Sequence, residues 1–215
     1  MGRGCGPLIV ARKDSPLRPA DSAGGLAALA DDLSRVRVAV PGELTTAALL
    51  SGLFTGTTRH RVVMPFDRIM PAVAAGEAAA GVIIHEGRFT FGSYGLRRLV
   101  DLGEWWESTT ELPIPLGGIA VSRALGRELQ EQVERAVFES VSYARGHPDA
   151  SREYVAAHSQ EIDPVVCQAH IDLYVNDATL GYGAEGERAI GRLLAAATDA
   201  GLVEASQKSL FWDGA

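Results

Sequence analysis

The sequence predicts an α/β protein built around a small, doubly wound sheet. Short apolar segments of strand length alternate with helical segments between residues 35 and 84, in the order β-α-β-α-β. These strands are apolar enough to be covered by helices on both faces. From Ala124 onward the apolar residues recur at helical spacing, so the C-terminal part is expected to be helical throughout.

Each predicted element has a local signal. Branched apolar runs predict strands, and Pro41-Gly42 closes one of them. The predicted strands are Leu8–Arg12, Arg35–Val40, Arg61–Met64 and Gly81–Ile84. The predicted helices are Leu26–Leu33, Thr45–Leu53, Phe66–Ala75, Leu125–Val141, Asp149–Ala157, Asp163–Leu173 and Glu185–Ala200, with Asp149 as an N-cap and His147-Pro148 as a stop.

Two segments that flank the β-α-β-α-β unit resemble each other. Gly6–Arg12 and Leu116–Arg123 are similar in length and apolar content, and both end in arginine. Bracketing strands of this kind are typical of the two crossovers of a bilobed, periplasmic-binding-protein-like fold. Coincidence between two short strands is the alternative.

The composition restricts the kinds of partner that the protein is expected to bind. The formal net charge is −7 over 215 residues, with no dense basic cluster, which argues against nucleic acid and anionic membrane surfaces. No run approaches the roughly 18 apolar residues of a membrane span. Cys5 and Cys167 are far apart and lack a metal-ligand spacing, which fits a reducing cytoplasm. His158 and His170 lie on predicted helices without such a spacing either, so no metal is expected.

His85 is the most informative position in the sequence. It is the first polar side chain after the predicted strand Gly81–Ile84, and open α/β sheets bind ligands outside the carboxyl ends of their strands. Imidazole is the side chain best suited to move protons near neutral pH. From this segment alone, a structural histidine at a strand end is the favoured alternative.

Thr45 and Thr46 form a second candidate. They follow a predicted strand and Pro41-Gly42, at the start of a helix. Hydroxyls and backbone N–H groups at a helix N-terminus suit a carboxylate or another anionic oxygen. Simple capping of the helix is the alternative.

Three weaker candidates each have a structural alternative. Trp105 and Trp106 would line an aromatic pocket or anchor a helix to the core, and anchoring is favoured for at least one. Tyr174 and Asn176 offer hydrogen bonds at the end of a helix, or Asn176 caps its C-terminus. Cys5 would be a reactive thiol, although among its sequence neighbours only Arg3 favours the thiolate.

Seven short strings point to one family when they are taken together and in order. They are GRGCGPLIVAR from Gly2, VPGELTT from Val40, FDRIMP from Phe66, IHEGRFT from Ile84, DLGEWW from Asp101, LPIPLGG from Leu112 and YVN from Tyr174. Over Gly2 to about Leu210, the chain resembles the 1,4-dihydroxy-6-naphthoate synthases of the futalosine route to menaquinone.

The resemblance implies a cytoplasmic carbon–carbon lyase with a bilobed periplasmic-binding-protein type II-like fold. It implies conversion of cyclic dehypoxanthinyl futalosine to 1,4-dihydroxy-6-naphthoate without a metal or redox cofactor. The proton acceptor of the family falls on His85, and its paired substrate-binding threonines fall on Thr45 and Thr46. The implied partner is a small-molecule substrate, and a homodimer is left open.

One departure from the family concerns the start of the chain. The family has a strand–helix–strand segment of the first lobe before the Gly2–Gly6 region, so we expect much of that lobe to be absent here and the true start to lie upstream. The expected division is a crossover strand at 1–13, the second α/β lobe with His85 at 14–112, and the return crossover with C-terminal helices packing toward the first lobe at 113–215. A small-anion-binding module and an inactive truncated paralogue are the alternatives.

Overall fold

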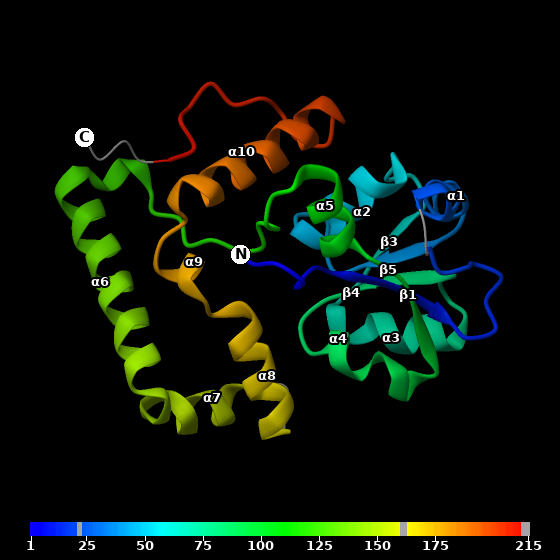
Figure 1. The fold of residues 1–215 in the computed structure, drawn as a ribbon, viewed down its shortest axis with the longest axis horizontal. Helices are drawn as coiled ribbons and strands as arrows, with labels where there is room; N and C mark the ends of the chain where they lie inside the picture. The colour runs from blue at the N-terminus through cyan, green and yellow to red at the C-terminus, as the bar shows by residue number, and fades with distance from the viewer. Residues whose placement is uncertain (21–22, 160–162, 212–215) are drawn as a thin grey trace.

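The computed structural model describes residues 1–20, 23–159 and 163–211. Its described residues contain one five-stranded sheet in the order β3-β2-β4-β1-β5 (Figure 1). The strands are β1 Leu8–Arg12, β2 Val38–Val40, β3 Arg61–Val63, β4 Ala80–Ile83 and β5 Leu96–Asp101. Strands β2, β3 and β4 are parallel, whereas β1 lies between β4 and β5 and runs antiparallel to both.

Helices cover both faces of this sheet, as Figure 1 shows. Side chains alternate along β1 between the two faces of the sheet. Ile9 and Ala11 pack on the face covered by α1, α2 and α5, and Leu8 and Val10 pack on the face covered by α3. The helices of this part are α1 Ala23–Ser34, α2 Thr46–Thr55, α3 Phe66–Ala75, α4 Gly87–Thr90, the 3-10 helix η1 Phe91–Tyr94, and α5 Leu102–Thr110. This two-sided covering confirms the predicted α/β class.

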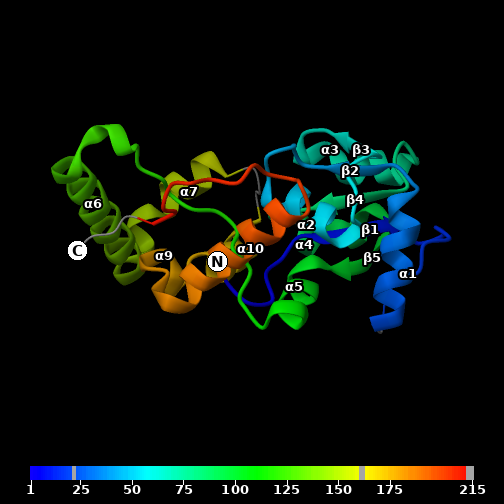
Figure 2. The same ribbon diagram turned by 90° about the horizontal axis from the view of Figure 1, so that it is seen from above.

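The remaining helices stand to one side of the sheet, and α10 returns across α2 (Figures 1 and 2). They are α6 Arg127–Gly146, α7 Arg152–His158, α8 Pro164–Tyr174, α9 Asp177–Leu180 and α10 Gly183–Asp199, with 3-10 helices η2 Arg123–Leu125 and η3 Pro148–Ser151. Asp163 caps α8 by accepting from the backbone of Val165. Helix α6 keeps large apolar side chains exposed, including Leu129 and Phe138. Among the described helices, none is long and apolar enough to cross a membrane.

The first residues of the chain connect the helical part to the sheet. The side-chain amide of Asn176, between α8 and α9, donates to the carbonyl of Met1 at 2.8 Å. Arg3 pairs with Glu185 of α10 at 2.9 Å, and Gly2 exchanges two backbone hydrogen bonds with Ile114. Residues 1–3 therefore contact both the segment after α5 and the last helices.

Several sequence predictions need correction. The predicted strand Leu116–Arg123 is wrong, because residues 115–122 form no strand and Ile119 and Val121 are exposed. Asn176 is not a C-cap but the N-cap of α9, where it forms a capping box with Thr179. Asp149 lies inside η3 and is not the cap of α7, whose N-cap position is Ser151. The division at residues 13 and 113 stays a prediction.

Strand β5 is not among the strands predicted from the sequence. Its sequence, LRRLVD, places two arginines side by side and so breaks the apolar run that marks a buried strand. The strand lies at the sheet edge, where Arg98 is exposed and pairs with Glu104. Edge strands tolerate such charges because one side of the strand faces solvent.

A close contact between two backbones fixes α5 against the segment before β1. A Cβ atom on Gly103 would lie 2.7 Å from the nitrogen and Cα of Gly6, and one on Gly6 would lie 2.2 Å from the nitrogen of Gly103. The amide of Leu102 donates to the carbonyl of Pro7 at 2.9 Å. Only glycine at both positions permits this approach.

A buried ion pair also fixes the N-terminal segment against the start of α5. The guanidinium of Arg88, in α4, pairs with Asp101 and also donates to the carbonyls of Gly4 at 2.9 Å and Gly6 at 2.6 Å. Asp101 is fully buried, and its other oxygen caps α5 by accepting from the backbone of Gly103 at 2.8 Å. One arginine thus joins the turn after β4 to the N-terminal segment and to the start of α5.

The backbone contact predicts opposite effects for two helical glycines. Gly103→Ala should lower the free energy of unfolding by about 1–3 kcal/mol, because the new methyl group overlaps the Gly6 backbone. Gly191→Ala, in α10 with open space around it, should raise the free energy by roughly 0.5–1 kcal/mol through helix propensity. Urea unfolding of both variants measures the difference, and equal effects would contradict the contact.

The buried ion pair predicts a large loss on removal of its arginine. Arg88→Met should destabilise the chain by about 3–5 kcal/mol, since Asp101 would keep a buried charge without its partner. Arg35→Met is the matched control, because the Arg35–Asp31 pair is exposed and should contribute about 0–1 kcal/mol. Chemical denaturation compares the two variants, and a loss at Arg88 no larger than at Arg35 would overturn the assignment.

Candidate functional site

The candidate site lies at one edge of the sheet, where three parallel strands end. Val40 pairs with Val63, and Ala39 pairs with Gly81, so the parallel strands β2, β3 and β4 end at the same edge of the sheet. The segments that follow them are therefore neighbours at the carboxyl edge of the parallel strands, which is where α/β sheets bind ligands. They carry the two threonines, the start of α3 and His85.

His85 occupies a sharp turn between β4 and α4. Its φ angle is 53°, in the left-handed region that non-glycine residues seldom adopt. Successive turn hydrogen bonds run from Gly87 to the carbonyl of Ile84 and from Arg88 to the carbonyl of His85, both at 3.2 Å. The turn leaves the His85 side chain exposed, although Ile83, two residues earlier, is buried. Such strain is often found at functional sites.

Two aromatic rings flank the imidazole of His85. The ring of Phe66, the first residue of α3, lies 5.3 Å away at an interplanar angle of 74°. The ring of His170, on α8, lies 5.6 Å away at 83°. Both are edge-to-face contacts. A cavity of about 190 Å³ opens at this place and is lined by Phe66, His85, Glu86, Ser159, Val166, Cys167 and His170.

His170 and Tyr174 extend the group of rings along α8. Their ring centroids are 4.6 Å apart. Burial lowers the pKa of His170, the positive charge of protonated His85 lowers it further, and Glu86 acts in the opposite direction. Burial raises the pKa of Tyr174. Near neutral pH both side chains are therefore favoured in their uncharged forms.

The sequence predicts no role for His170, because its spacing from His158 is not that of metal ligands. Its contact with His85 joins residues 85 positions apart, which no local pattern reveals. A usable signal was present in the four-residue spacing between His170 and Tyr174, which places both on one face of a helix.

Thr45 and Thr46 lie at the start of α2, as predicted, but do not line the cavity at His85. The Thr45 hydroxyl accepts from the amide of Ala48 and donates to the carbonyl of Gly42, both at 3.1 Å. The Thr46 hydroxyl donates to the carbonyl of Leu116 at 2.6 Å. The capping alternative is thus confirmed for Thr45, and contact of either residue with a ligand stays a prediction.

The weaker candidates have structural roles. Trp106 is buried and donates to the carbonyl of Pro113, while Trp105 packs edge to face on Phe54. Both tryptophans therefore anchor α5, and neither lines the His85 cavity. Cys5 is also buried, and burial raises the pKa of its thiol, which disfavours the reactive thiolate.

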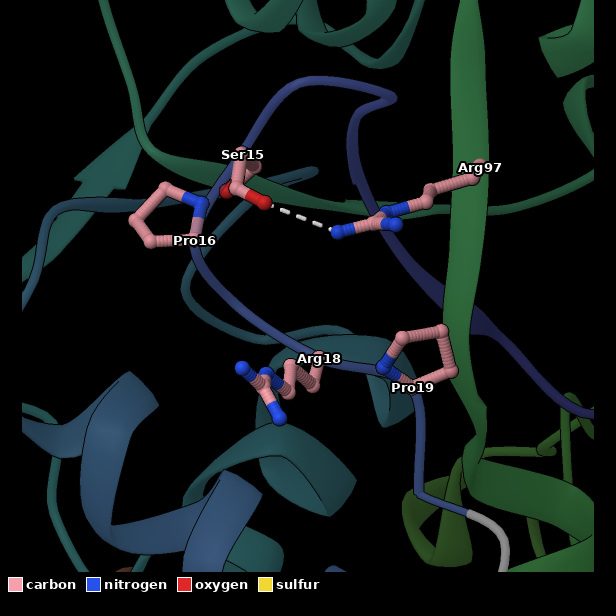
Figure 3. A pocket seen from close by; sticks show the side chains of 5 residues that line it. All are labelled: Ser15, Pro16, Arg18, Pro19 and Arg97. Atoms are coloured by element: carbon pink, nitrogen blue, oxygen red, sulfur yellow. Dashed lines mark hydrogen bonds between the residues drawn. The ribbon is translucent and has the colours of Figure 1, made fainter.

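A second cavity lies at the opposite edge of the sheet, in the loop after β1 (Figure 3). Strand β1 is antiparallel to β4, so its end is remote from His85. Arg97 closes this loop by donating to the carbonyls of Ser15 at 2.8 Å and Leu17 at 2.9 Å. Among the described residues, no group of three or more His, Cys, Asp or Glu side chains is arranged to hold a metal ion.

Comparison with known proteins identifies close relatives. A family model described as menaquinone biosynthesis matches residues 1–199. The 1,4-dihydroxy-6-naphthoate synthase of Thermus thermophilus is 46% identical over 211 residues, which are 98% of this chain and 72% of that protein. The enzyme of that name from Streptomyces coelicolor is 47% identical over 210 residues, 95% of this chain and 69% of that protein.

Solved structures agree on the fold. Protein AF1704 from Archaeoglobus fulgidus superposes with a TM-score of 0.80 at 37% identity, over 94% of this chain and 70% of that one. A putative periplasmic sulfonate-binding protein from Methylobacillus flagellatus gives a TM-score of 0.54 at 14% identity, over 96% of this chain and 62% of that one. The chain has a periplasmic-binding-protein-like α/β fold. It belongs to the menaquinone-biosynthesis enzyme family that includes the 1,4-dihydroxy-6-naphthoate synthases.

Proposed function

We propose that this chain converts cyclic dehypoxanthinyl futalosine to 1,4-dihydroxy-6-naphthoate, with His85 as the general base. The observation that carries the proposal is the position of His85. It lies at the carboxyl end of β4, with an exposed imidazole beside a cavity, in a chain that is 46% identical to a synthase of that name. Family membership supports the reaction, and the turn after β4 supports the choice of base.

The chemistry asks for a group that removes a proton from carbon. Loss of a proton beside an activating group allows a carbon–carbon bond to break, and aromatisation of the naphthoate ring supplies driving force. A neutral imidazole within reach of that carbon typically accelerates such a step by about 10²–10⁴-fold. The edge-to-face contacts with the rings of Phe66 and His170 limit the orientations of the His85 ring.

Thr45 and Thr46 are proposed to hold the substrate carboxylate. Their place at the start of α2 puts a positive helix end behind the anion. In the ligand-free arrangement the Thr46 hydroxyl donates to Leu116. Binding of a carboxylate would therefore turn this hydroxyl from the Leu116 carbonyl to the substrate, where a charged acceptor makes the stronger hydrogen bond.

A cytoplasmic location is part of the proposal, because both cysteines are free and a reducing compartment keeps them so. Cys167 lines the proposed site, where an oxidised sulfur would alter the cavity wall. A homodimer stays a prediction from the family resemblance.

Removal of the proposed base provides the first test. His85→Asn should lower kcat by about 10²–10⁴-fold and leave KM nearly unchanged. Asparagine is chosen because it tolerates the left-handed backbone at this position. Formation of 1,4-dihydroxy-6-naphthoate is followed by chromatography.

His147→Asn is the control for that experiment. His147 is an exposed histidine beyond α6 that stacks on Tyr143 and does not line the cavity, so its replacement should not change turnover. Normal kcat in the His85 variant would rule out His85 as the base. A wild-type chain that binds the futalosine compound in calorimetry without converting it would instead indicate a binding module.

The carboxylate contact predicts a change in KM. Thr46→Val keeps the shape of the side chain but removes the hydroxyl, and should raise KM by roughly tenfold or more, the value of one charge-assisted hydrogen bond. Thr46→Ser keeps the hydroxyl and should stay within about threefold of wild type. Steady-state kinetics on both variants separate a lost contact from a packing defect, and equal KM values would exclude the contact.

A further inference from the structure

His170 lies at the proposed site although no family motif includes it. It comes from α8, 85 positions after His85 in the sequence, and its ring meets the His85 ring edge to face at 5.6 Å. Both rings line the same cavity. Tyr174, one helical turn further along α8, also contacts the ring of His170, with ring centroids 4.6 Å apart.

The placement of His170 is built into the fold. Helix α8 starts at a side-chain cap, where Asp163 accepts from the amide of Val165 at 2.8 Å. Beyond its end, Asn176 ties the chain to the carbonyl of Met1 at 2.8 Å. The cap fixes where the helix begins, and the Asn176 contact ties the residues after its end to the N-terminal segment.

His85 needs such support because its own surroundings are open. The side chain is exposed, and the turn that carries it has a strained backbone. Phe66 flanks the ring from α3. Without the second ring contact, from His170, the imidazole would have more freedom to rotate toward solvent. A base that is misplaced by about 1 Å can lose about 10²-fold in rate.

The surroundings of His170 favour its uncharged form, so its ring is more suited to packing against His85 than to carrying a proton. The groups that face it are His85 and Glu86 from the turn after β4, and Cys167 and Tyr174 from its own helix. Burial and protonated His85 both lower the pKa of His170, while Glu86 opposes them. When His85 accepts a proton, His170 is therefore driven further toward its neutral form.

We propose that His170 is a positioning residue for His85: the ring of His170, which contacts the rings of both His85 and Tyr174, holds the imidazole of the base in the orientation that proton transfer requires. The inference rests on the proposed role of His85 as general base. It adds a residue from the C-terminal helices to a site that is otherwise formed at the sheet edge.

Two substitutions separate the ring of His170 from its nitrogen atoms. His170→Ala removes the ring and should lower kcat by about 10–100-fold with little change in KM. His170→Phe restores an aromatic ring and should recover kcat to within about threefold of wild type, because edge-to-face packing on His85 is kept. His147→Ala is the control, and thermal unfolding verifies that every variant folds.

A readout without turnover keeps this inference separate from the proposed reaction. The ring-proton resonances of His85 in NMR spectra, assigned with the His85→Asn variant, should shift in His170→Ala and stay near their wild-type positions in His170→Phe. If His85→Asn turns over normally, the proposed base fails, whereas unchanged His85 resonances in His170→Ala overturn the positioning role directly. The role is also overturned if His170→Ala keeps full kcat, or if His170→Phe is as impaired as His170→Ala.

Discussion

The buried pair of Arg88 and Asp101 is the interaction on which the remaining geometry depends. Arg88 lies three residues after His85, so whatever fixes Arg88 also fixes the turn that presents the imidazole. Its partner, Asp101, caps α5, and its other acceptors are the carbonyls of Gly4 and Gly6. A charged pair in a buried place is costly to form unless every donor and acceptor is satisfied. Here the aspartate accepts from the backbone as well as from the arginine, so the costs of burial are offset.

The N-terminal segment joins this pair to the opposite wall of the cavity. Gly4 and Gly6 contact Arg88, and Met1 holds Asn176 just beyond α8. The ring of His170 is thereby connected to the turn of His85 through a short stretch of backbone as well as through direct contact. The family motifs GRGCG and YVN, which are far apart in the sequence, meet at this place, and each supplies hydrogen bonds rather than reacting groups.

Much of the sheet could be read from the sequence, because its strands are short, branched and buried on both faces. Phe66–Ala75 and Leu8–Arg12 match the predicted bounds. Prediction failed where tertiary contacts decide the outcome. β5 contains arginines that only an edge position explains, and Leu116–Arg123 has the composition of a strand but no neighbouring strand in the described structure. The position of His85 at the site could be predicted, because it is the first polar residue after a buried strand and α/β sheets bind ligands at their strand ends. Its contact with His170 could not, because that contact depends on how the last helices pack against the sheet.

The left-handed backbone of His85 has a consequence for the evolution of the chain. Any L-residue with a side chain is strained at a φ of 53°, whereas glycine is not, so replacement by glycine would relieve about 1 kcal/mol. Selection for stability alone would therefore favour glycine at this position. In the proposed role of His85 as general base, a small loss of stability accompanies the direction in which the imidazole points.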